Sequence, residues 1–66
     1  MEYTNSQIRE LIAEHIHSER DRNILIERLV NGRTFETLSE EFLLSERQIK
    51  NIVYNNEKIL FRYIPG

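Results

Sequence analysis

The chain has 66 residues, of which 39% are hydrophobic, and it carries a formal net charge of −2. This length corresponds to one small domain, in which folding buries only about 60% of the surface that the unfolded chain exposes. The absence of cysteine excludes disulfides and thiolate zinc sites, and two Gly and one Pro leave few turns for a β fold. We therefore expect a single all-α domain over residues 1–66.

The N-terminal half of the chain predicts two amphipathic helices. The first, over residues 5–16, begins after Thr4 with the S/T-x-x-Q spacing of a capping box. The second, over residues 19–31, begins after Ser18, a good N-cap. The pair Asn31-Gly32 can adopt the left-handed backbone conformation that ends a helix. Their apolar residues recur at helical spacing: Ile8, Leu11, Ile12, Ile16, Ile24, Leu25, Ile26, Leu29 and Val30.

The C-terminal half predicts a short helix and a long helix separated by a tight turn. The short helix, over residues 35–42, is capped by Thr34, and the long helix, over residues 46–62, begins after Ser45 with a second capping box. Pro65 disfavours helical geometry at the residue before it, so the long helix should end shortly before that proline. The chain therefore has four predicted helices. The apolar residues of the last two are Phe35, Leu38, Phe42, Ile49, Ile52, Val53, Ile59 and Leu60.

The segment over residues 34–54 has the outline and the apolar spacing of a helix-turn-helix. Ser39 is the small residue at the closest approach of its two helices. Leu43 departs from the pattern, because the turn favours Gly at positive φ and Leu costs about 1 kcal/mol there. The alternative interpretation is an ordinary helical hairpin in a small bundle. The positions expected to be buried between the two helices are Leu38, Phe42, Leu44, Ile49 and Ile52.

On a helical wheel, the long helix divides into an apolar face and a polar face. The polar face suits duplex DNA, because Arg pairs with guanine, Asn pairs with adenine, and Lys and Tyr reach phosphates. The first residues of a recognition helix enter the major groove, so we expect base contacts from Glu46, Arg47, Lys50 and Asn51. The alternative is the solvated polar face of any surface helix. The predicted DNA-contacting residues are Ser45, Glu46, Arg47, Gln48, Lys50, Asn51, Tyr54 and Lys58.

Charge is unevenly distributed along the chain. Residues 1–45 carry five Arg against nine Asp and Glu, a net charge of −4, whereas residues 46–66 carry four Lys and Arg against two Glu, a net charge of +2. The positive surplus therefore coincides with the long helix, and local charge governs where an anionic partner docks.

Residues 20–62 resemble the C-terminal, promoter-reading domain of bacterial sigma factors, their fourth conserved region. The resemblance lies in RDRNIL at the start of the second helix, in TFETLSEEF, similar to the family's T-x-E-E-I-A-E-x-F, and in SERQIKNI, close to its recognition-helix opening. It implies binding of the minus-35 promoter element and contact with RNA polymerase through the flap of the β subunit. The family often has Arg-Glu-Arg where this chain has Glu46-Arg47-Gln48, and Arg and Gln where it has Lys50 and Asn51.

The resemblance is to this module standing alone, as in small regulators encoded by phage or mobile elements. No segment of the sequence corresponds to the regions of a sigma factor that bind the polymerase clamp and melt the promoter. Promoter melting is therefore not an expected activity.

Catalysis and metal binding have little support in the sequence. His15 and His17 are two residues apart, so they point in different directions on a helix and lack further ligands at suitable spacing. A small four-helix chain offers no obvious cleft for a catalytic carboxylate, and the sequence has no glycine-rich phosphate loop. We therefore expect no enzymatic activity, no metal and no other cofactor.

The end of the chain is more apolar than an exposed helix terminus needs. Phe61 falls on the polar side of the wheel, and together with Tyr63 and Ile64 it predicts a protein contact surface. The expected partner is a second copy, in a homodimer, or a larger protein such as RNA polymerase. The alternative is that these residues close the core as an irregular terminus.

These patterns predict a sequence-specific regulator of transcription that binds double-stranded DNA. The alternative is a protein-interaction module that binds RNA polymerase or a sigma-family partner without strong DNA affinity. The acidic total and Glu46 favour the alternative, and the face from Arg47 to Lys58 opposes it. The N-terminus lacks the features of a secretory signal, and no apolar run reaches the ~20 residues of a membrane span, so we expect a cytoplasmic protein without a membrane partner.

Overall fold

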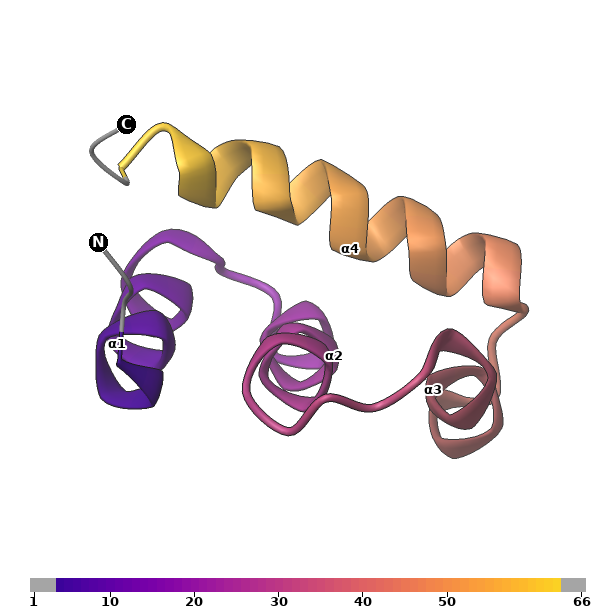
Figure 1. Ribbon diagram of the computed structural model, residues 1–66. Coiled ribbons are helices and arrows are strands. Elements are labelled where there is room, and N and C mark those ends of the chain that lie inside the picture. The colour runs from indigo at the N-terminus through magenta and orange to yellow at the C-terminus, as the bar shows by residue number, and fades with distance from the viewer. Residues whose placement is uncertain (1–3, 64–66) are drawn as a thin grey trace.

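The computed structural model describes residues 4–63, and within this range all regular structure is α-helical. Helices α1 (Asn5–His15), α2 (Glu19–Leu29) and α3 (Phe35–Phe42) lie side by side in one layer. Helix α4 (Glu46–Phe61) crosses over all three, with its N-terminal end above α3 and its C-terminal end above α1 (Figure 1). The expected all-α fold of four helices is confirmed. None of the described helices is both long enough and apolar enough to cross a membrane.

Each helix begins where the sequence predicts, because a hydroxyl side chain caps it. The side chains of Thr4, Ser18, Thr34 and Ser45 accept hydrogen bonds from backbone N–H groups three residues later, at 3.1–3.3 Å. Both capping boxes are complete, since the backbone N–H of Thr4 donates to Gln7 at 2.8 Å and that of Ser45 donates to its glutamine at 2.9 Å. Local capping chemistry therefore sets all four helix starts.

Three helices end slightly earlier than predicted. Helices α1 and α4 each end one residue early, and α2 ends at Leu29, two residues early. After α2, the N–H groups of Asn31 and Arg33 donate to carbonyls of the last helical turns at 3.2 and 3.0 Å, while the chain reverses at Gly32 with a φ of 71°. These bonds replace the regular helical pattern and so shorten α2.

The core lies between the three-helix layer and α4. Leu38 and Ile49 are fully buried as predicted, but Phe42, Leu44 and Ile52 are only half-buried. The difference arises because α3 is the last helix of the layer, so within residues 4–63 no further helix covers the outer side of α3 or the part of α4 above it. The buried apolar residues are Ile12, Ile16, Ile24, Leu25, Leu38, Ile49, Val53 and Leu60.

The connection between α3 and α4 contains the left-handed residue that the sequence predicts. Leu43 has a φ of 55° and a ψ of 41°, and it is the one non-glycine residue with positive φ among residues 4–63. The N–H group of Leu44 donates to the carbonyl of Ser39 at 3.1 Å, the six-to-one bond of a Schellman motif. The side chain of Leu43 is 91% exposed, so it adds almost nothing to the core.

Candidate nucleic-acid interface

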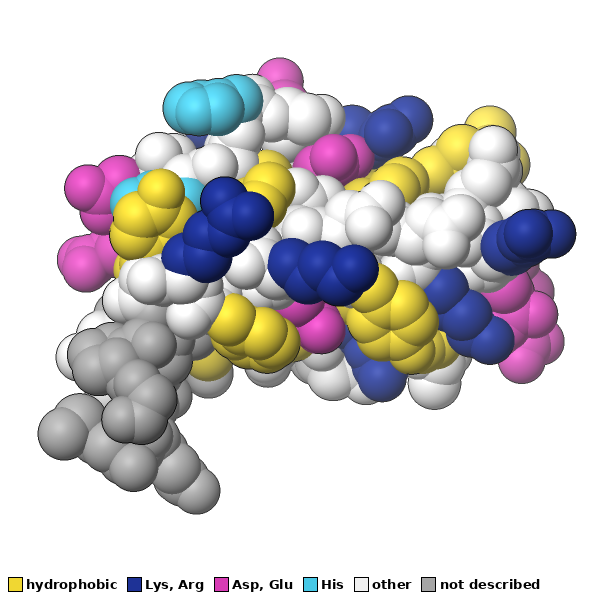
Figure 2. All heavy atoms as spheres, turned by 90° about the horizontal axis from the view of Figure 1, so that it is seen from above, with side chains coloured by type: hydrophobic (Ala, Val, Ile, Leu, Met, Phe, Trp, Pro, Cys, Tyr) yellow, Lys and Arg dark blue, Asp and Glu magenta, His cyan; other side chains and the backbone are white. Residues whose placement is uncertain are grey.

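Helix α4 has one buried face and one solvent-exposed face. Val53, Asn56 and Leu60 are buried, whereas Tyr54 and Lys58 between them are exposed to solvent. Figure 2 looks down on this outward face and shows Lys and Arg side chains along it, with hydrophobic side chains between them. All eight predicted DNA-contacting residues are exposed: Ser45, Glu46, Arg47, Gln48, Lys50, Asn51, Tyr54 and Lys58.

The first turn of α4 combines capping with exposed polar groups. The hydroxyl of Ser45 and the side-chain oxygen of Gln48 are both engaged in the capping box. The amide nitrogen of Gln48 keeps its two donors for another partner. Glu46 lies in the first turn, where its negative charge stabilises the positive end of the helix dipole, and this accounts structurally for an acidic residue at the tip.

Among the residues that the structure describes, the cations on the outward face of α4 have no acidic partner. Within residues 4–63, no carboxylate oxygen lies within 4.0 Å of the charged nitrogens of Arg47, Lys50 or Lys58. Two arginines elsewhere in the chain are neutralised, since Arg20 lies 3.2 Å from an aspartate and Arg33 lies 3.1 and 3.4 Å from two glutamates. The outward face of α4 is therefore locally positive, although the whole chain has a net charge of −2.

A cluster of cations and aromatic rings adjoins this face where α2, α3 and α4 meet. The guanidinium carbon of Arg28 lies 4.2 Å from the centroid of the Phe35 ring, and Nζ of Lys50 lies 5.7 Å from the same centroid. The ring of Tyr54 meets that of Phe35 edge-on, with centroids 6.0 Å apart. Sequence reasoning did not include Arg28 or Phe35 in the site, because no periodic pattern connects residues on different helices.

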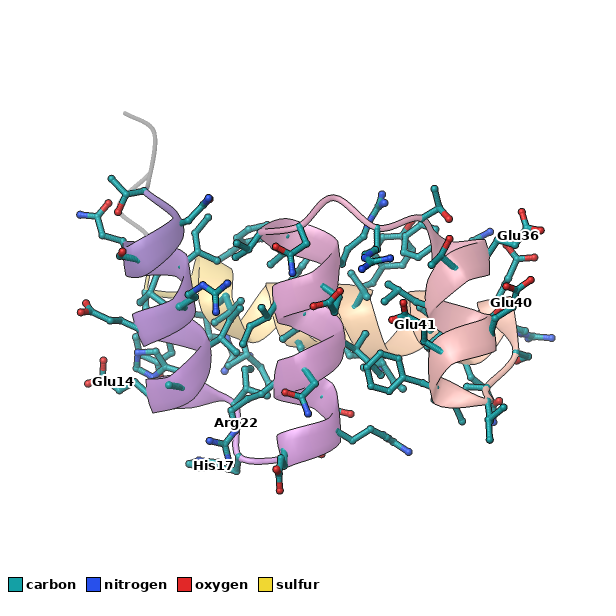
Figure 3. All side chains as sticks on the ribbon, turned by 90° about the horizontal axis from the view of Figure 1, so that it is seen from below. Glu14, His17, Arg22, Glu36, Glu40 and Glu41 are labelled. Carbon is teal, nitrogen blue, oxygen red and sulfur yellow. The ribbon has the colours of Figure 1, made fainter. Side chains whose placement is uncertain are left out.

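The acidic side chains of α3 lie away from the outward face of α4. Figure 3 shows Glu36 and Glu40 projecting from the free side of α3, while Glu41 projects toward α2. Glu41 lies 3.4 Å from Arg33, which also binds Glu27. Because α3 packs beneath α4, these carboxylates leave the cations of the outward face unpaired.

The predicted protein contact residues lie at the other end of α4. The side chain of Phe61 is 61% exposed, and that of Tyr63 is 52% exposed. The ring of Tyr63 stacks on the ring of His15 in α1, with centroids 3.6 Å apart and planes 4° apart, so one of its faces is covered. Ile64 lies outside the described residues. Phe61 is therefore the freest of the aromatic side chains at this end.

The two histidines belong to separate environments. His15 is half-buried beneath Tyr63, and its Nε2 lies 4.0 Å from a carboxylate oxygen of Glu14, whereas His17 is exposed. In the described part of the chain, no group of three or more His, Asp or Glu side chains is arranged to hold a metal ion.

Comparisons of the sequence with family models, and of the chain with curated proteins and with solved structures, found no match. The resemblance to the sigma-factor domain therefore rests on the residues that carry it and stays a prediction.

Proposed function

We propose that this chain is a cytoplasmic regulator of transcription that binds double-stranded DNA through the outward face of α4. The observation that carries this proposal is the set of exposed cations on that face, Arg47, Lys50 and Lys58, which have no carboxylate within 4.0 Å among residues 4–63. Because these cations have no ion-pair partner in the described chain, they can pair with an external anion. Duplex DNA presents one negative charge per about 1.7 Å of its axis.

The dimensions of α4 suit the major groove. An α-helix with its side chains is about 10–12 Å across, and the major groove of B-DNA is about 12 Å wide. In this arrangement α3 and α4 act as a helix-turn-helix, with α3 supporting α4 from behind and the turn at Leu43 setting the angle between them.

The polar residues along the outward face of α4 then have distinct roles. Arg47 and Asn51 lie in the N-terminal half, where forked donors and amides read guanine and adenine edges, and Lys50 lies beside them. Tyr54 and Lys58 follow along the same face, where the helix leaves the groove, and they contact phosphates. Base preference therefore resides in the first two turns, and sequence-independent affinity in the later ones.

The proposal is tested by selecting bound sequences from random duplex DNA and titrating variants against the selected site and a scrambled duplex. Arg47→Ala should cost roughly 1–3 kcal/mol on the selected site and relax the preference at one base position. Lys58→Ala should weaken binding to both duplexes equally, because phosphates carry no sequence information. Failure of the unaltered chain to bind or enrich any duplex would overturn the proposal.

A second function is favoured by one observation, the exposure of Phe61 at 61%. Tyr63, two residues later, is 52% exposed, and grouped exposed apolar side chains mark protein contacts. The sigma-like resemblance suggests RNA polymerase or a sigma-family protein as the partner. In this alternative the chain binds its partner without strong DNA affinity. The test is binding to purified RNA polymerase. If Phe61→Ser abolishes this binding and Arg47→Ala leaves it intact, the result would favour the protein-interaction alternative over direct DNA recognition.

A further inference from the structure

We infer that Arg28, on α2, is a further DNA contact that binds a backbone phosphate beside those reached from α4. This inference rests on the proposed function and extends it to a second helix. It follows from the position of Arg28 in the cluster of Phe35, Lys50 and Tyr54, which brings the last turn of α2 to the edge of the outward face of α4.

The Phe35 ring lies close to both the guanidinium of Arg28 and the ammonium group of Lys50. Both cations lie within 6 Å of the ring centroid, at 4.2 and 5.7 Å, a distance at which the electron-rich face of an aromatic ring attracts positive charge. The two centroid distances place these cations within about 10 Å of each other, so both contribute positive potential at this edge of the protein, where an anion would be attracted. The stacked guanidinium is already ordered, so binding costs less side-chain entropy than for a free arginine.

The hydrogen bonds around Arg28 leave most of its donors unused. The nearby carboxylate of Glu27 is occupied on both oxygens, since one accepts from the amide of Asn31 at 2.8 Å and the other from Arg33 at 3.1 Å. Arg28 makes one hydrogen bond, from Nη1 to the carbonyl of Arg33 at 2.9 Å. A guanidinium has five donors in a planar fork, which matches the oxygens of a phosphate.

The experiment compares Arg28→Gln with Arg20→Gln, a matched control that removes the same charge from the other end of α2, where an aspartate pairs with it. Each protein is titrated with a mixed-sequence duplex of about two helical turns at several salt concentrations. Loss of one phosphate contact should reduce the slope of log K against log salt by about 0.9 and weaken binding about fivefold at physiological salt. Arg20→Gln should leave the slope unchanged, and Arg28→Lys, which keeps the charge, should restore it.

The slope separates a DNA contact from a purely structural role. If Arg28 only stabilises the connection between α2 and α3, Arg28→Gln will lower the melting temperature and leave the slope as in the unaltered chain, which overturns the inference while the proposed function stands. If the unaltered chain binds no duplex, both fail. A reduced slope with Arg28→Gln alone, with helical content retained, supports the inference.

Discussion

Replacing Leu43 by Gly should leave the protein equally stable or make it more stable. Leu43 has a left-handed backbone with a φ of 55°, which costs a residue with a Cβ atom roughly 1–2 kcal/mol. Its side chain is 91% exposed, so its removal sacrifices almost no burial. Glycine relieves the backbone penalty, because it populates positive φ freely.

The opposing effect is the greater freedom that glycine gives to the unfolded chain, which costs about 0.4–1 kcal/mol. The unfolding free energy should therefore rise by between roughly zero and 1.5 kcal/mol, given the penalty that is relieved. For a domain of this size, 1 kcal/mol shifts the melting temperature by about 4–8 °C. We expect a melting temperature that is unchanged or higher by several degrees.

Thermal and urea unfolding, followed by helical circular dichroism, would measure the effect of Leu43→Gly. Leu43→Ala is the matched control, because it removes the exposed side chain and retains the Cβ atom, so its stability should stay close to that of the unaltered chain. Leu44→Ala should be destabilising, because Leu44 is half-buried against the core. A loss of stability in Leu43→Gly as large as that in Leu44→Ala would refute the reasoning.

Four further substitutions test the packing, a cap and the contact surface. Leu38→Ala should lower the unfolding free energy by about 2–5 kcal/mol in urea titrations, because Leu38 is fully buried. Asn56→Ala should lower it by about 1–3 kcal/mol, since the Asn56 amide donates to Asp21 at 3.2 Å and to a backbone carbonyl at 2.8 Å. Ser45→Ala should cost about 1 kcal/mol, visible as fraying of α4 in hydrogen exchange. Phe61→Ser should change the melting temperature little, because Phe61 is exposed. Sedimentation of the variant beside the unaltered chain measures whether Phe61 holds a homodimer together. Unfolding of the variant would place Phe61 in the core.

The helix starts could be predicted because their causes are local in sequence. A hydroxyl residue and its bond to a backbone N–H three residues later, as at Thr4 and Ser45, depend on no distant contact. The burial of Phe42 and Leu44 could not be predicted, because it depends on how α3 lies at the edge of the layer. Periodicity identifies which face of a helix is buried, but how deeply each residue is buried depends on the tertiary arrangement.

Part of the candidate site can be predicted from the sequence, and part is revealed only by the folded chain. The exposure of Arg47, Lys50 and Lys58 follows from the periodicity of α4 alone, and the structure bears it out. The contact of Arg28 with Phe35 joins two helices through a loop, so only the folded chain brings these residues together. The absence of carboxylates near these cations, within residues 4–63, is likewise a property of the fold, because it depends on which cations the acidic side chains of other helices reach.

The net charge of −2 is compatible with binding to DNA because the fold separates the two signs of charge. Arg33 pairs with Glu27 and Glu41, and Glu36 and Glu40 project from the side of α3 that faces away from α2. The screening length at physiological ionic strength is about 8 Å, so exposed charges farther apart than this interact weakly. Cations on the outward face of α4 would meet phosphates at contact distance, where screening is weakest. Lower salt lengthens the range of both the attraction by these cations and the repulsion by the carboxylates of α3, so the repulsion should grow as the ionic strength falls.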